Sequence, residues 1–343
     1  MRIIITLLLC VALVGCTTPQ PQPESPPINA DNAEAVESSE SPVEPAQHEA
    51  QHEAHPTHTD FLWEVRGGVG RVYLMGTMHV VRDGYSLTPA LLDIFDEMDA
   101  LALEADLLNF SNMMDFFYLS SFPEGETILD HLSERGQAHL LNMIDAYGLN
   151  ADYVITSRPF ALSSRFIDPI LAQSDFSFIG VDLMLHVLAW ERDMPIHELE
   201  DFRDYIRNVN ALPADSQERL MVLSITPPDD LLADLEFLYE LFLSGDEELI
   251  LAFIHDTMAQ TMGGDGLPIE FEPIDGRYSY YLMEARDRVM ADSIIGHLES
   301  GYNVFVAAGL AHFLGERSII YFLEQAGYYV TRVNLSERAL RAA

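Results

Sequence analysis

Hydrophobic and polar positions follow two alternating patterns from residue 61 onward. Short β-type runs are separated by stretches of helical periodicity, which is typical of an α/β domain. The first runs predict a β-hairpin in LWEVRGGVGRVYLMG, with its turn at residues 67–70. SLTPALLDIFDEMDA then predicts a helix with Thr88 as N-cap and Pro89 as its first residue. The following apolar run, ALALEAD, predicts a buried strand that ends near Glu104.

The same alternation returns twice further along the chain. FSFIGVD predicts a strand ending at Asp182, LMLHVLAWERD an amphipathic helix, and PIHELE a strand ending at Glu200. Near the C-terminus, residues 277–299 predict a long helix, YNVFVAAG a strand, GERSIIYFLEQAG a helix and YYVTRV a strand. We therefore predict two pseudo-equivalent α/β halves with a central mixed sheet and flanking helices. The acidic helical stretch between them predicts a helical insertion at about residues 204–275.

The stretch LLNFSNMMDFFYLSSF, residues 107–122, is rich in methionine and aromatic residues. Adaptable thioethers and rings suit a groove for an apolar peptide or lipid. Packing in the core explains the same residues and is the favoured interpretation.

The first 59 residues have no pattern of a folded domain. Residues 1–16 carry one arginine, an apolar run and then small residues before Cys16, which predicts a signal peptide. The ending LVGC resembles a bacterial lipobox, in which Cys16 would carry the lipid; an ordinary signal peptide is the alternative. Residues 17–59 contain hardly any bulky apolar residues and predict a disordered tether, which leaves residues 60–343 as the folded domain.

Composition excludes several classes of function. The net charge is −37, and nucleic-acid phosphates would repel so acidic a protein. We therefore expect no nucleic-acid partner, and contact with a membrane through the lipid anchor only. The two cysteines, Cys10 and Cys16, both lie at the N-terminal signal. The mature domain thus has no thiol for a disulfide, a metal site or a nucleophile. The chain also has no P-loop, G-x-S-x-G or HExxH motif.

A Gly-x-x-His motif follows two of the predicted strands. It occurs at residues 76–79, in LMGTMHV, and at residues 309–312, in AAGLAHFLG. A third copy, at residues 136–139, lies in a surface-helix pattern and is set aside. Glycine allows a sharp turn after the strand, so His79 and His312 can project over the strand ends, and we expect the two motifs to face one another across a crevice.

Two imidazoles and a carboxylate such as Glu104 form a familiar ligand set for a divalent metal ion. A metal held in this way lowers the pKa of bound water and polarises a carbonyl group. The alternative is that both histidines only cap loops through hydrogen bonds.

The chain resembles the TraB/PrgY/GumN family, bacterial relatives of the animal Tiki proteins. The resemblance rests on LMGTMH with ALALEAD, on GVDLMLHVLAWERDMPIHELE, on EARDRVMADSI and on NVFVAAGLAHFLGERSIIYFLEQAGYYV. It implies a fold similar to the erythromycin-esterase and ChaN-like proteins and the activity of a metal-dependent peptidase. It also implies that His79 and His312 lie at the metal site, with Glu104 as the acidic residue and Arg286 as the matching arginine. The family usually has Arg-Asn where this chain has Arg286-Asp287, so this chain carries an additional carboxylate at the position.

In this interpretation manganese, cobalt, zinc or iron is held by His79 and His312, while Glu104 is a ligand or a general base. Arg286 stabilises an oxyanion or binds a substrate carboxylate; an internal salt bridge to Glu104 or Asp182 is the alternative. Six residues are expected to surround and position this site: Gly76, Thr77, Asp182, Glu200, Asp287 and Gly309.

Two functions are compatible with these residues. The first is an exported, lipid-anchored, metal-dependent hydrolase of a peptide or small molecule. The second is a non-catalytic lipoprotein that binds a peptide signal, haem or metal. They differ in whether bound metal retains an exchangeable water and hydrolyses an amide or ester.

Overall fold

The computed structural model describes residues 61–263 and 283–335. The signal segment 1–16 with Cys16, the tether 17–59 and the first residues of the predicted long helix, 277–282, lie outside the described residues. Their structure therefore remains a prediction. Within the described part of the chain, no helix combines the length and the apolar character that crossing a bilayer requires.

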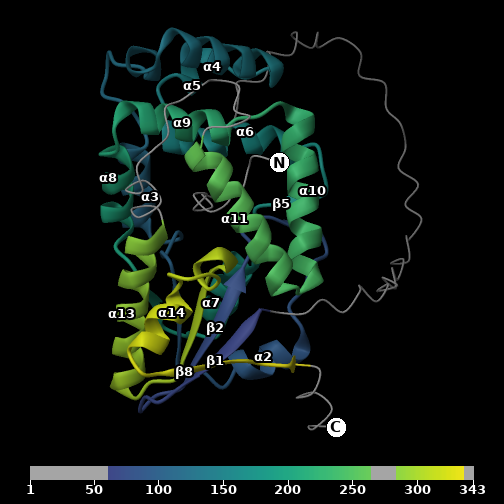
Figure 1. Cartoon of the computed structure of the whole chain (residues 1–343), viewed down its shortest axis with the longest axis vertical. Coiled ribbons are helices and arrows are strands. Elements are labelled where there is room, and N and C mark those ends of the chain that lie inside the picture. Colours follow the sequence, from purple (N-terminus) through teal and green to yellow (C-terminus); the bar gives the residue numbers. More distant parts are fainter. Residues whose placement is uncertain (1–60, 264–282, 336–343) are drawn as a thin grey trace, which may run out of the picture. The chain divides into compact units, whose positions relative to one another are not determined.

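The domain contains a six-stranded mixed sheet, whose strands β1, β2 and β8 are labelled in the lower half of Figure 1. Its strands have the order β6 (Ile196–Glu198), β4 (Ala100–Leu103), β7 (Val304–Gly309), β2 (Val72–Thr77), β1 (Leu62–Arg66) and β8 (Tyr329–Arg332). The first four strands are parallel, whereas β1 is antiparallel to both of its neighbours. The predicted α/β class, the mixed central sheet and the hairpin of β1 and β2 are confirmed.

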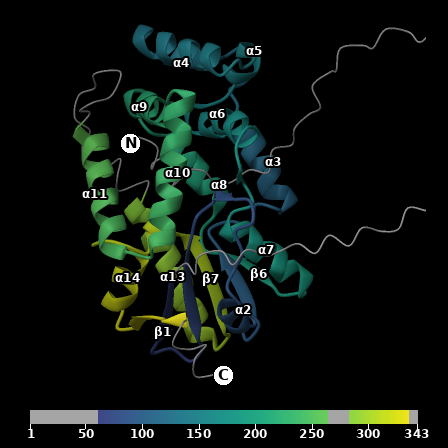
Figure 2. The same ribbon diagram turned by 90° about the vertical axis from the view of Figure 1, so that its right-hand side faces the viewer.

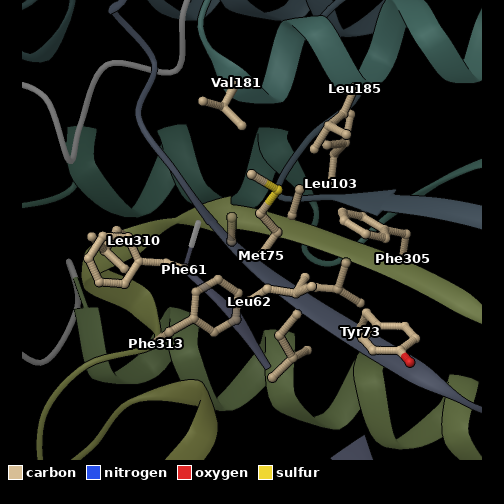
Figure 3. Packing of buried hydrophobic residues seen from close by; sticks show 14 of the residues in the cluster. Phe61, Leu62, Tyr73, Met75, Leu103, Val181, Leu185, Phe305, Leu310 and Phe313 are labelled. Carbon is tan, nitrogen blue, oxygen red and sulfur yellow. The ribbon is translucent and has the colours of Figure 1, made fainter. Parts of the chain in front are cut away.

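Helices cover both faces of this sheet (Figure 2). On one face lie α2 (Pro89–Phe95) and α7 (Val181–Glu191), and on the other α13 (Ala285–Ser300) and α14 (Ile319–Gln325). All residues of β2, β4 and β7 are buried, as expected for parallel strands covered on both sides. Figure 3 shows Val181 and Leu185 of α7 approaching Met75 of β2 within the hydrophobic core. The loops after β2 and β7 lead to helices on opposite faces, so a crevice is expected at these strand ends.

Besides the helices that cover the sheet, the structure contains two further groups of helices. The first consists of α3 (Phe110–Leu119), η1 (Ile128–His131), α4 (Glu134–Ala146), α5 (Ala151–Val154), η2 (Pro159–Ala161) and α6 (Leu162–Leu171). The second consists of α8 (Phe202–Asn210), α9 (Ala214–Ser224), α10 (Pro228–Ser244) and α11 (Glu247–Gly263). The second group lies where the sequence predicts a helical insertion. The third Gly-x-x-His copy lies on α4, away from any strand end, as its pattern indicates.

The methionine- and aromatic-rich stretch forms α3, in which no residue is fully buried. Phe116 stacks on Phe202 and makes an edge contact with Phe160. Phe110 and Phe117, by contrast, are mostly exposed. Core packing therefore accounts for part of the stretch, since Leu107, Phe116 and Leu119 pack against a buried cluster, whereas Phe110 and Phe117 face solvent.

One predicted strand is much shorter than expected. β5 covers only Phe176–Ser177 and pairs with β3 (Val81–Arg82) in a separate two-stranded sheet. Asp182 is therefore not at a strand end but in the first turn of α7. An apolar run of this length does not distinguish a strand from the start of a buried helix, and here Gly180 begins the helix.

The two Gly-x-x-His units lie side by side in the same sheet rather than across a crevice from one another. β2 and β7 are parallel neighbours, with Gly76 opposite Ala308 and Thr77 opposite Gly309. The two motifs are thus offset by one residue. Their connections also differ, because β7 continues into a 3-10 turn, η4 (Leu310–His312), while the chain after β2 is irregular.

Candidate functional site

His79 lies in the irregular segment after β2 and faces the N-terminus of α7. The Val181 N–H donates to the carbonyl oxygen of Met78 at 3.0 Å and holds the two segments together. Gly180 allows this approach, since a Cβ there would lie 2.4 Å from the carbonyl carbon and oxygen of His79. The contact brings Asp182 Oδ1 to 3.1 Å from His79 Nδ1, an ion pair that is not aligned for a hydrogen bond.

The protonation of His79 is set by opposing effects. Burial lowers the pKa of the imidazole, but the charges of Asp182 and Glu104 and the contact with Asp182 raise it to about 9. His79 is therefore positively charged at neutral pH when nothing else binds it. A metal ligand must be neutral, so any metal at His79 would have to displace this proton.

His312 is carried by η4 directly after β7 and is 1% exposed. Its Nδ1 lies 2.5 Å from Oδ1 of Asp287 on α13. Burial raises the pKa of Asp287, and the His312 charge and hydrogen bond partly offset this rise. In the tautomer with its proton at Nδ1, Nε2 carries no proton, so Asp287 orients the ring and selects the nitrogen that faces the site.

Glu104 follows β4 and lies between the two histidines. Its Oε1 accepts a hydrogen bond from the Gly309 N–H at 2.6 Å, and its Oε2 is 3.6 Å from His312 Nε2. Burial raises the pKa of the carboxyl group, but His312, Arg286 and His79 together lower it to about 2. Glu104 is therefore a carboxylate at neutral pH and carries no proton.

Arg286, on α13, is the central cation of the cluster. Its guanidinium donates to Glu104 Oε2 at 2.6 Å and, through Nε, to Glu200 at 2.8 Å. It also lies 3.3 Å from His312 Nε2 and 4.3 Å above the ring of Tyr205. Burial lowers the pKa of Arg286, but Glu200 and Glu104 raise it well above its ordinary value. Of the two internal partners considered for Arg286, the structure shows Glu104, with Glu200 in place of Asp182.

Gly309 lies next to all three candidate ligands, His79, His312 and Glu104. A Cβ at this position would lie 3.4 Å from Glu104 Oε1, 3.7 Å from His79 Nε2 and 3.7 Å from His312 Cδ2. Gly76 packs closely against Leu310, and a Cβ at this position would lie 2.5 Å from Leu310 Cδ1. The glycines therefore have different roles: Gly76 permits close packing, and Gly309 keeps the space beside the histidines open.

The predicted residues thus gather at one end of the sheet. Thr77 is also buried there, and its Oγ1 has no hydrogen-bond partner among the described residues. Tyr205 and Gly180 belong to the same cluster, although the sequence motifs do not indicate them. The only sequence signal for Tyr205 is the apolar face of α8, which it shares with Phe202, Ile206 and Val209.

The donor chemistry of this cluster fits a divalent metal, but its arrangement is not that of a closed site. Among the described residues, no group of three or more His, Cys, Asp or Glu side chains converges on one point. The guanidinium of Arg286 contacts both Glu104 and His312 on the side where Glu104 Oε2 and His312 Nε2 approach each other. A metal held by His79, His312 and Glu104 would require this guanidinium to move away from Glu104.

A family model described as the TraB/PrgY/gumN family matches residues 61–332, which is most of the chain. The chain therefore belongs to the TraB/PrgY/gumN family. No curated protein and no solved structure gives a significant match.

Proposed function

We propose that this protein is a metal-dependent hydrolase that cleaves an amide bond in a peptide. One observation carries the proposal: two imidazoles, each next to a carboxylate at Nδ1, lie beside the same buried carboxylate, Glu104. Carboxylate–imidazole pairs of this kind orient histidines as metal ligands through Nε2. His79, His312 and Glu104 would hold the ion.

When bound, a divalent metal at this position supplies a water of lowered pKa and polarises the substrate carbonyl. The remaining chemistry falls to the side chains. Asp287 and Asp182 hold the two imidazoles in place, and the Gly309 N–H fixes the direction of Glu104. In the overall reaction, water oxygen adds to the carbonyl carbon and the C–N bond breaks. One proton from the water passes to the leaving amine.

We assign Arg286 a positioning role instead of direct contact with the substrate. Its side chain is 5% exposed, and its hydrogen-bond donors face Glu104 and Glu200. A guanidinium with this environment neutralises the two carboxylates that would otherwise repel each other and an incoming anionic group. Its positive charge still lies beside the site and favours negative charge that develops there.

Metal content of the purified chain tests the proposal. The His79→Ala/His312→Ala double variant should lose the manganese, cobalt, zinc or iron that the wild type retains, together with cleavage of a peptide library. His139→Ala is a matched control, because His139 belongs to the third Gly-x-x-His copy and lies on α4. If the wild type binds none of these ions after reconstitution, or cleaves peptides equally well without its histidines, the metal-dependent mechanism is wrong.

A second candidate is a non-catalytic lipoprotein that binds a peptide signal, haem or metal. The position of Arg286 favours it, because its guanidinium occupies the ligand side of Glu104 and His312. This candidate predicts bound ligand without turnover. Single-turnover cleavage of any peptide, lost in the double variant and retained in His139→Ala, would exclude it.

We further propose that the protein is exported and anchored through Cys16. The supporting observation is the LVGC ending of the apolar N-terminal run. A Cys16→Ser variant should appear in the soluble fraction of the host and incorporate no labelled fatty acid. Unchanged membrane association and labelling of that variant would contradict the anchor.

A further inference from the structure

An apolar pocket with a volume of about 100 Å³ opens directly beside His79. One wall consists of Thr77, Met78 and His79, together with the chain around Gly309, so the pocket touches both Gly-x-x-His motifs. The opposite wall is formed by α10 and α11, which contribute Leu238, Leu241, Phe242, Ile250, Phe253 and Ile254.

The two sides of His79 differ in polarity. Apart from His79 itself, no charged side chain among the described residues lines the apolar pocket. On the other side of the same imidazole lies a smaller pocket, where the carboxylates of Glu104 and Asp182 contribute to the wall. His79 therefore separates a space suited to hydrocarbon from a space suited to the polar groups of a reacting bond.

The wall of the apolar pocket is partly accessible from outside. Leu241 and Phe242 are buried, and the Phe242 ring packs against Phe61 at 5.8 Å between centroids. Leu238, Phe253 and Ile254 are only half-buried. Core packing thus explains the base of the pocket, whereas its half-buried side chains retain apolar surface that a ligand can cover.

We propose that this pocket binds one large apolar side chain, of the size of leucine or phenylalanine, on the residue next to the amide bond that is cleaved. The inference rests on the proposed hydrolase function and names its substrate class. A side chain in the pocket places the adjoining backbone amide against His79, with its polar atoms toward Glu104 and Asp182. Because even one methylene in a hydrophobic pocket changes kcat/KM by about 10-fold or more, leucine should exceed glycine at this position by at least about 100-fold.

The test uses two leucine-to-tryptophan variants of the full chain. Leu238→Trp adds bulk to the pocket wall, whereas Leu249→Trp changes an exposed leucine on α11 that does not line the pocket. Both variants are compared on matched peptides with leucine or glycine at the varied position. The leucine-to-glycine ratio of kcat/KM should fall at least about tenfold in Leu238→Trp and stay within about twofold of wild type in Leu249→Trp.

A binding measurement separates failure of the pocket from failure of the hydrolase. N-acetyl-leucinamide and N-acetyl-glycinamide are titrated against the same proteins by NMR. Preferential binding of the leucine compound, reduced in Leu238→Trp alone, supports the pocket even if no peptide is cleaved, and that outcome refutes the hydrolase only. Cleavage with equal kcat/KM for leucine and glycine, or equal binding of both amides, overturns the pocket.

Discussion

Replacing Gly309 by alanine should raise the stability of the fold and at the same time lower the rate of peptide cleavage. Gly309 has φ −51° and ψ 134°, which an L-residue adopts without strain. Its new Cβ would meet Glu104 Oε1 at 3.4 Å and His79 Nε2 at 3.7 Å, which are ordinary van der Waals contacts. The unfolded chain meanwhile loses conformational freedom, so the free energy of unfolding should rise by about 0.4–1 kcal/mol.

The same methyl group would occupy the space between the three candidate ligands. Ligand–metal bonds are about 2.0–2.2 Å long, so a methyl carbon 3.4–3.7 Å from these side chains crowds an ion or water that they share. Because a displacement on the order of 1 Å costs about 100-fold in rate, peptide cleavage by Gly309→Ala should fall by about that factor. Urea unfolding and metal analysis of the same sample measure both effects.

Two other glycines provide the controls. In Gly76→Ala the new Cβ would lie 2.5 Å from Leu310 Cδ1 and 3.2 Å from Phe61 Cβ, so overpacking should destabilise the fold by about 1–3 kcal/mol. Gly296→Ala, on α13 with nothing within 4 Å, should stabilise the protein and leave activity unchanged. A folded Gly309→Ala protein with full metal content and full activity would refute the assignment of this space as the reactive centre.

Three further outcomes follow from the charges at the site. The pKa of Glu104 is lowered from 4.5 to about 2, so its contribution of roughly 3 kcal/mol to stability is present above pH 4.5 and lost as the pH falls toward 2. The pKa of His79 is raised from 6.5 to about 9, so a similar contribution is present below pH 6.5 and lost as the pH rises through about 9. Urea midpoints should therefore be highest between these limits. Asp287→Ala should lower metal retention about 10–100-fold, while Asp287→Asn, which keeps an acceptor for the imidazole, should lose less in the same metal analysis. Arg286→Met leaves two buried carboxylates without their cation and should reduce the urea unfolding free energy by about 3–5 kcal/mol.

Each of these outcomes has its own control. In Glu104→Gln the urea midpoint should fall less as the pH is lowered from 4.5 toward 2. The same fall as in the wild type would contradict the role of this carboxylate. For Asp287, equal loss in the alanine and asparagine variants would show that charge, and not the orientation of His312, is what the site requires. For Arg286, Arg317→Met is a control, because the side chain of Arg317 is 60% exposed and pairs with Glu284 at the surface. Equal stability of these two methionine variants would contradict the buried ion network.

Local patterns predicted much of the fold. The apolar runs that become β2, β4 and β7 are continuous because both of their faces are covered, and the helices between them follow a 3.6-residue period. The same approach failed for FSFIGVD and was only partly right for α3. In the first case a short apolar run fits a strand and a buried helix start equally well, and in the second an apolar composition does not say which side of a helix is covered.

The sequence by itself determined that two strands end in Gly-x-x-His and that a carboxylate follows a third. These are properties of neighbouring residues, and backbone geometry alone carries each side chain to a strand end. Only the tertiary structure decided which groups meet there. Arg286 binds Glu104 across 182 positions of sequence, and the Gly309 N–H binds the same carboxylate across 205. Sequence periodicity indicates whether a side chain faces inward, but it does not identify the residue that this side chain contacts. Charge pairing depends on how elements that are far apart in the sequence pack together.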